Sequence, residues 1–354
     1  MNKYIKLIII LLSSILGLLI IGLLSLNLLT GAVNKNDETI IYFDVPKNST
    51  YLTLANSLKE QGFIRSVLGY KIYIKLFPPT TLEAGKYKLS KSMSVKEIIK
   101  LFEEGSNYNP DAVILTIPEG RSIEQIADII SKITNNTKSN LIKVWDSNEF
   151  VNAAIEKYWF IDNTVLKNGI RHPLEGYFFT STYELLNKDV TPEYIAYKML
   201  DQMDKVLTKY KTDIEKNELT IHEILNLSSI VQYESGLSSD MPDIAEVFYN
   251  RLEIGMKLQS SVTVCYALGD VSDWKECEFN SDLNSPYNTY YYEGLPIGPI
   301  LNFGEEALKA VLYPNTNDYY YFMANVCNPS DSKTYFSKTY QEHLEKVNKY
   351  LTCY

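Results

Sequence analysis

A long apolar run near the N-terminus constrains this chain more than any other feature of its sequence. From Leu7 to Leu24 it is apolar apart from two adjacent serines, and it continues more weakly to Val33. About 20 such residues span a bilayer. Because Lys3 and Lys6 precede the run, the positive-inside rule predicts that the first few residues are cytoplasmic and that the chain after Asn34 is outside.

The alternative for this segment is a cleaved signal peptide. The apolar core of a signal peptide is typically ~7–15 residues, which is shorter than this run. No lipidation cysteine follows the run. We therefore predict an uncleaved single-pass anchor within residues 1–36, which places the protein in the cell membrane with its remaining domains extracytoplasmic.

The length and charge of the chain bound its organisation and partners. Its 354 residues are too many for one ordinary hydrophobic core and are enough for two domains besides the anchor. The net charge of −9, with no basic stripe, argues against nucleic acid as a partner. The polar stretch 105–111 is a plausible linker, so we predict domains at residues 37–108 and 109–354.

Short periodic segments predict a small α+β module in the first domain. They indicate strands at residues 39–45 and 84–89 and a helix that ends at Gly62. A second helix should begin at Ser94, because Glu97 three residues later completes a capping-box pattern. Gly105 should end that helix.

The second domain is predicted to be a larger mixed α+β domain. A strand is expected at 113–117 and a helix after Ser122, with further helical segments in 140–200. Later helices are expected at about 240–252 and 339–350. The Gly-, Pro-, Asn- and Tyr-rich chain from Thr263 onward predicts loops and short strands that wall a groove.

One carboxylate in this domain lies where a helix should be apolar. Thr220 and Glu223 form a capping-box pattern that begins a helix, and Gly236 can end it. Leu227, Ile230, Val231 and Glu234 follow one face of that helix, at positions i, i+3, i+4 and i+7. A carboxyl in such a place is costly to ionise, so its pKa should rise toward the range of a general acid. The alternative is a carboxylate that simply reaches water at the helix end.

Four cysteines lie in the last quarter of the chain, on its predicted outer side, where disulfides are permitted. Of the three possible connectivities, we favour nearest-neighbour pairing of Cys265 with Cys277 and of Cys327 with Cys353. A metal site is disfavoured because there is no C-x-x-C spacing and there are three histidines in all. The same scarcity argues against a Ser-His-Asp hydrolase.

Several short motifs follow one another along the chain after the N-terminal anchor. They are Ala84-Gly-Lys-Tyr, Met93-Ser-Val-Lys-Glu-Ile, Ile117-Pro-Glu-Gly, Leu174-Glu-Gly-Tyr-Phe-Phe, Ser229-Ile-Val-Gln-Tyr-Glu, Val247-Phe-Tyr-Asn-Arg-Leu, Gly255-Met-Lys-Leu-Gln, the run from Tyr287 to Ile300, and Glu342-His343. The run from Tyr287 to Ile300 is the most specific of these. In this order, and over nearly the whole chain, the anchor and the motifs resemble the YceG-like family of endolytic murein transglycosylases.

The resemblance implies a fold and a reaction. It implies a membrane helix, a small LysM-like module that binds glycan weakly, and a catalytic domain with a lysozyme-like catalytic helix. The implied reaction cleaves the β-1,4 bond between N-acetylmuramic acid and N-acetylglucosamine inside nascent peptidoglycan strands. It leaves 1,6-anhydromuramic ends, uses no metal or cofactor, and would terminate glycan elongation. Cell-wall synthases are candidate partners.

The resemblance assigns the catalytic carboxylate to Glu234. Candidate hydrogen-bonding residues for the sugars are Gln259, Tyr287, Asn288 and Thr289, each with a structural role as the alternative. Glu175 is a further candidate for the substrate site. Since it precedes a glycine in a predicted tight turn, a carboxylate that caps backbone amides is an equally good interpretation.

The sequence departs from the family pattern at three sites, one of them a pair of residues. Gln232 stands where the family usually has an acidic residue, and Ser261 where it tends to have an aspartate near the groove. Thr180-Ser181 replaces a Pro-Asp pair. These changes leave two alternatives open, a peptidoglycan-binding scaffold with lost or weak catalysis and a structural membrane-anchored partner of cell-wall synthesis enzymes. The retained Glu234 argues against the first of these.

Overall fold

The computed structural model describes residues 17, 21–22, 24–106, 109, 111–269, 275–325, 327–328 and 333–351. The chain divides into two compact units, residues 1–110 and 111–354. In the part of the chain that is described, no helix is both long and apolar enough to cross a membrane. The predicted anchor at Leu7–Leu24 lies almost entirely outside the described residues.

The first unit is a small α+β module, as predicted. Its elements are β1 (Ile41–Val45), α2 (Tyr51–Glu60), α3 (Val67–Leu76), β2 (Gly85–Leu89) and α4 (Val95–Glu104). The two strands pair antiparallel with Phe43 opposite Tyr87. The rings of Phe43, Tyr87 and Phe102 pack together in its core. The capping box of Ser94 and Glu97 is present, whereas α3 was not predicted.

The second unit is mostly helical. Its helices before residue 240 are α5 (Ile123–Ser131), α6 (Lys138–Trp145), α7 (Asn148–Lys157), η1 (Asn163–Leu166), α8 (Pro192–Lys209), α9 (Lys211–Lys216), α10 (Ile221–Glu234) and η2 (Ser238–Asp240). The later helices are α11 (Met241–Glu253), α12 (Ser261–Leu268), α13 (Lys275–Phe279), α14 (Glu305–Leu312) and α15 (Tyr340–Tyr350). Two antiparallel pairs complete it, β3 (Val113–Thr116) with β4 (Thr182–Leu185) and β5 (Tyr321–Ala324) with β6 (Thr334–Ser337).

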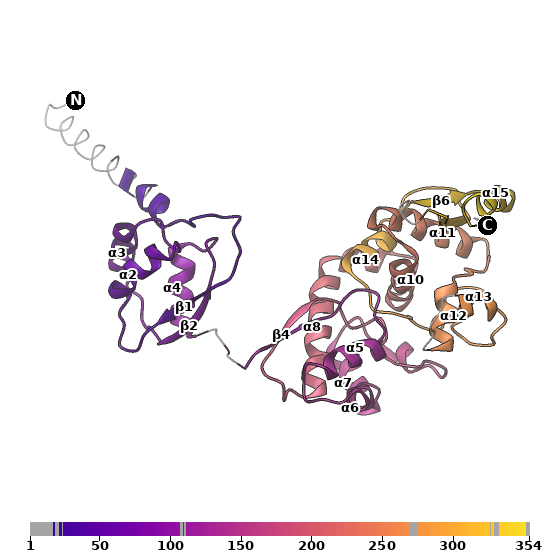
Figure 1. The fold of residues 1–354 in the computed structure, drawn as a ribbon, viewed down its shortest axis with the longest axis horizontal. Coiled ribbons are helices and arrows are strands. Elements are labelled where there is room, and N and C mark those ends of the chain that lie inside the picture. The colour runs from indigo at the N-terminus through magenta and orange to yellow at the C-terminus, as the bar shows by residue number, and fades with distance from the viewer. Residues whose placement is uncertain are drawn as a thin grey trace, which may run out of the picture. The chain divides into compact units, whose positions relative to one another are not determined.

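Helix α10 is the central element of this unit. Thr220 and Glu223 form the predicted capping box at its start, and it packs against α11, α12 and α14 (Figure 1). Every residue from Ile224 to Val231 is buried. The apolar stripe is therefore one side of a segment that is buried all round, whereas Tyr233 in the last turn is exposed and the helix ends at Glu234.

The prediction for residues after Thr263 was incomplete, because this region also contains α12, α13 and α14. Neither Ser260 nor Gly304, the N-cap residues of α12 and α14, makes a side-chain capping hydrogen bond. Without a capping signal, turn-forming residues dominated the sequence pattern. These helices are stabilised by burial instead, as in α14, where Ala307, Leu308 and Val311 are buried.

A disulfide joins α12 to α13. It links Cys265 with Cys277, which confirms the first predicted pair. The second predicted pair includes Cys353, which lies outside the described residues. Since α13 is only five residues long, we infer that this covalent link to α12 holds it in place.

Candidate functional site

Glu234 ends α10, and its carboxyl accepts a hydrogen bond from a serine hydroxyl. The Ser260 Oγ donates to Glu234 Oε1 at 2.5 Å. Although Glu234 is only half-buried as a residue, desolvation of its carboxyl raises the pKa, and the Ser260 hydrogen bond and the Arg251 charge offset only part of that rise. A raised pKa brings this carboxyl toward the range of a general acid, as expected from the sequence.

The position of Ser260 depends on a cluster of buried hydroxyls. The Ser260 backbone N–H donates to Thr289 Oγ1 at 3.0 Å, and the hydroxyls of Thr289 and Thr263 are 2.9 Å apart. The exposed Gln259 precedes this cluster in a left-handed conformation with φ of 48°, and its N–H donates to the Thr289 carbonyl. Two predicted site residues, Gln259 and Thr289, are therefore brought beside the partner of Glu234.

Arg251 is a buried cation whose charge lowers the pKa of Glu234. Its Nε donates to the Tyr320 carbonyl at 2.6 Å and its Nη1 to the Leu258 carbonyl at 2.5 Å. Burial lowers the pKa of this guanidinium, while Glu234 opposes that change. In the sequence, Arg251 stands out only as part of a motif, and Ser260 only as the start of Ser260-Ser-Val-Thr263, a stretch that departs from the family pattern. The hydrogen bond of Ser260 and the charge of Arg251 at Glu234 make them candidates for the site.

Tyr290 also lies in the electrostatic field of Glu234. Burial and the nearby carboxylate raise the pKa of its phenol to about 12, so the hydroxyl stays protonated at neutral pH and can donate a hydrogen bond. Its backbone N–H donates to Oδ1 of the buried Asn288 at 2.9 Å. The Asn288 amide donates to the carbonyls of Ser281 and Leu283. In this structure Asn288 therefore orders the loop that presents Thr289 and Tyr290.

Tyr287 lies at the opposite end of α12 from Ser260. Its buried hydroxyl accepts from the Arg171 backbone N–H at 3.0 Å. Its ring packs edge-on against Tyr266, with the ring centroids 4.8 Å apart. Because Tyr266 also donates to Glu175, Tyr287 lies at the Glu175 end of α12. Thr289, from the same motif, lies at the other end, where it contacts Ser260.

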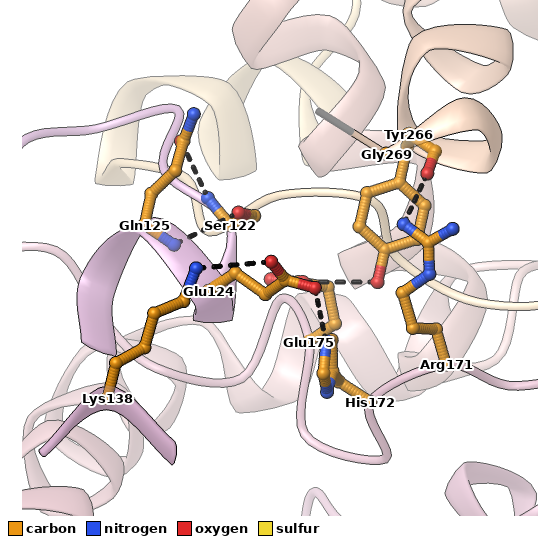
Figure 2. Close-up of a pocket in the computed structure, with 9 residues that line it drawn as sticks. All are labelled: Ser122, Glu124, Gln125, Lys138, Arg171, His172, Glu175, Tyr266 and Gly269. Carbon is orange, nitrogen blue, oxygen red and sulfur yellow. Dashed lines mark hydrogen bonds and ion pairs between the residues drawn. The ribbon is translucent and has the colours of Figure 1, made fainter. Parts of the chain in front are cut away.

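Glu175 is fully buried and joins three segments of the unit. Its carboxyl accepts from the Ile123 backbone N–H at the start of α5 (3.0 Å), from the Asn302 side chain (2.8 Å) and from the Tyr266 hydroxyl (3.1 Å). Burial outweighs these donors and raises the pKa of Glu175 to about 8. This geometry matches the backbone-capping alternative. Glu175 also lines a cavity, whose labelled side chains are drawn in Figure 2.

The face of α10 away from Glu234 anchors the loop before α14. Asn226 donates to the Pro296 carbonyl, Ser229 accepts from the Ile300 N–H, and Gln232 Oε1 accepts from the Gly304 N–H at 2.8 Å. The predicted loop-forming role of the Gly- and Pro-rich run is consistent with this arrangement. Gln232 is used structurally and points away from the Glu234 carboxyl.

Candidate metal ligands do not gather at either carboxylate. Within the described parts of the chain, no group of three or more His, Cys, Asp or Glu side chains is arranged to hold a metal ion.

The chain is similar to known proteins over most of its length. Residues 43–349 match the model of the YceG-like family. The chain is 35% identical to an endolytic murein transglycosylase of Bacillus subtilis, over 90% of this chain and 87% of that protein. It is 30% identical to one from Streptococcus pneumoniae, over 90% of this chain and 60% of that longer protein. A 2.6 Å crystal structure of a yceG-like protein from Listeria monocytogenes matches with 37% identity and a TM-score of 0.61, covering 87% of this chain and 99% of that one.

Proposed function

Because this chain belongs to the YceG-like family, we propose that it is an endolytic murein transglycosylase with Glu234 as its catalytic acid and base. The observation that supports this most directly is the raised pKa of Glu234 beside the Ser260 hydroxyl. The relatives in B. subtilis and S. pneumoniae have the same named activity.

In the proposed reaction, Glu234 first acts as the acid. Its proton passes to the glycosidic oxygen between C1 of N-acetylmuramic acid and the following N-acetylglucosamine, and the C1–O bond breaks. The 2-acetamido group of the muramic sugar stabilises the positive charge at C1. The ionised Glu234 then takes the proton of the sugar's 6-hydroxyl, and O6 bonds to C1 as a 1,6-anhydro ring. Glu234 ends protonated, and no water is consumed.

The surroundings of Glu234 suit both halves of this cycle. Burial favours the protonated acid, whereas the Ser260 hydrogen bond and the Arg251 charge favour the carboxylate that must act next. Because these effects oppose each other, neither protonation state of Glu234 is strongly favoured. The same carboxyl can therefore donate a proton and then accept one. Gln259 directly precedes Ser260, and Glu234 influences the pKa of Tyr290. We propose that both residues contact sugar hydroxyls or acetamido groups.

The cellular setting is a second part of the proposal. We propose a single-pass cell-membrane anchor at the N-terminus, an extracytoplasmic catalytic domain, and a glycan-binding role for the module in residues 37–108. In that setting the enzyme would cut nascent strands and so limit their elongation. Protease protection of the domains in intact spheroplasts would contradict this orientation.

Digestion of purified murein in ¹⁸O-labelled water tests the reaction. A transglycosylase leaves 1,6-anhydromuramic ends without the label, and internal cuts give fragments of many lengths at early times. Labelled reducing ends would instead show a hydrolase. Retention of the polymer without any cleavage would indicate the scaffold alternative that the departures at Gln232 and Ser261 raised.

A further inference from the structure

The polar cavity that Glu175 lines is at the far end of α12 from Glu234. It has a volume of about 370 Å³ and is lined by side chains from α5, α6, α12 and the loop before the Glu175 turn. Figure 2 shows Lys138, Glu124 and His172 on one side and Arg171 with Tyr266 on the other. The proposed reaction uses none of these side chains.

His172 gives this cavity an unused hydrogen-bonding atom. The residue is 6% exposed, and its Nδ1 is 2.8 Å from Asp146 Oδ2. Nε2 has no hydrogen-bond partner among the described residues, with Glu124 Oε1 3.6 Å away. Burial alone would lower the pKa of His172, but the hydrogen bond and the charge of Asp146 raise it overall. When the ring is protonated, its Nε2–H faces the cavity beside Glu124.

The charges of the cavity wall favour an anion. Lys138 and Arg171 are cationic. Glu124 opposes both Lys138, at 3.3 Å, and His172, and the Arg171 guanidinium donates to the carbonyls of Tyr266 and Ala267, which carry no net charge. His172 is balanced by Asp146. Because the pKa of Glu175 is about 8, this carboxyl is mostly protonated at neutral pH and does not repel an anion. Lys138, Arg171 and His172 together supply donors suited to a carboxylate group.

Helix α12 connects this cavity to Glu234. Ser260, directly before the helix, donates to Glu234, and Tyr266 in its last turn donates to Glu175. Six residues along a helix correspond to roughly 9 Å. A glycan of a few sugars bound at Glu234 could therefore reach the cavity with one of its substituents.

We propose that this cavity is an accessory subsite that binds a carboxylate of the murein strand, through Lys138, Arg171 and His172. The inference rests on the proposed function for its choice of ligand. Murein offers two sources of this group, the stem peptide and, where the peptide has been removed, the lactyl substituent of N-acetylmuramic acid.

Lys138→Gln is the informative variant, because Lys138 is a partly exposed side chain at the cavity rim. Lys132→Gln is a matched control, since Lys132 makes a similar ion pair, with Asp128, outside the cavity. His172→Gln, which can still hydrogen-bond Asp146, is a second variant. Thermal unfolding of all three proteins checks that they fold.

Each full-length protein is assayed on three substrates. These are peptide-bearing strands, amidase-stripped strands with free lactyl carboxylates, and stripped strands whose carboxylates have been converted to amides. Lys138→Gln should raise KM about tenfold on the strand whose carboxylate is bound, with kcat unchanged. It should have no effect on the amidated strands. The substrate that shows the loss identifies the source of the carboxylate.

Wild-type kinetics of both variants on both carboxylate substrates would overturn the subsite, as would an equal loss on amidated strands. Binding of the same strands to Glu234→Gln protein separates this inference from the proposed function. If binding depends on Lys138 but wild-type protein cleaves no strand, the subsite stands and the proposed reaction fails. If cleavage proceeds and binding is independent of Lys138, the subsite alone is wrong.

Discussion

The Ser260 hydroxyl donates a hydrogen bond to the Glu234 carboxyl, 26 residues earlier in the chain. This contact joins the end of the central helix α10 to the start of α12. It also sets the balance between the two protonation states of Glu234, because a donor stabilises the carboxylate and opposes the effect of burial.

Ser260→Ala should therefore raise the pKa of Glu234 further. The limb of the kcat/KM profile on which the acid loses its proton should move to higher pH by about one unit, the value of one hydrogen bond to a charged group. The pH dependence of murein cleavage measures this shift. Ser260→Thr keeps a hydroxyl and should restore the wild-type profile. A shift to lower pH in the alanine variant would contradict the assignment.

Glu234→Gln should keep the fold and abolish glycan cleavage. The change is nearly isosteric but removes the transferable proton, and general acid–base catalysis is worth ~10²–10⁴-fold. The control is Glu223→Gln on the same helix, because glutamine also completes a capping box. Release of anhydro-ended fragments measures the activity of both proteins. Turnover of the Glu234 variant at the wild-type rate would remove this residue from the mechanism.

Gln232→Glu should change activity by no more than a few fold. Gln232 Oε1 accepts the Gly304 N–H, and a glutamate oxygen can do the same. Gln232→Leu leaves that N–H without its acceptor and should cost about 1–3 kcal/mol of unfolding free energy. Chemical denaturation and murein digestion of both variants measure these effects. A large gain of activity in the glutamate variant would mean that the site needs a second carboxylate.

Gly176→Ala should destabilise the second unit more than Gly294→Ala. Both glycines have a left-handed conformation, with φ of 81° and 80°, which costs a non-glycine residue about 1–2 kcal/mol. A Cβ at 176 would also lie 2.3 Å from Pro299 Cβ, whereas at 294 no described atom lies within 4 Å. Overpacking should add about 1–3 kcal/mol at position 176 alone. If denaturant titrations show that both variants lose the same unfolding free energy, the close contact of position 176 with Pro299 is relieved in solution.

Glu175 should make stability fall as pH rises. Its pKa is about 8 in the folded protein against 4.5 as the ordinary value, so the folded state binds a proton that the unfolded chain has released. This stability is fully present below about pH 4.5 and is lost as pH rises through about 8, by up to about 1.4 kcal/mol per pH unit. Glu175→Gln should flatten that slope in denaturation curves measured from pH 5 to 8. An unchanged slope would assign it to other groups.

Local sequence signals predicted the parts of this protein that depend on neighbouring residues. The capping box at Thr220 and the apolar stripe ending at Glu234 predicted α10 and its unusual carboxylate, because helix caps and helix faces are set within a few residues. The nearest-neighbour disulfide of Cys265 and Cys277 was also predicted. The order of the motifs predicted the family.

Tertiary structure alone decided which residues meet Glu234. Ser260 reaches its carboxyl because Thr289, 29 residues further on, accepts the Ser260 N–H, and no local pattern encodes that contact. The same packing sends Tyr287 to Glu175, two positions away from Thr289 in one motif. Helices α12 and α14 begin without side-chain caps and are stabilised by burial, so their existence depended on a core that forms only when distant segments pack together.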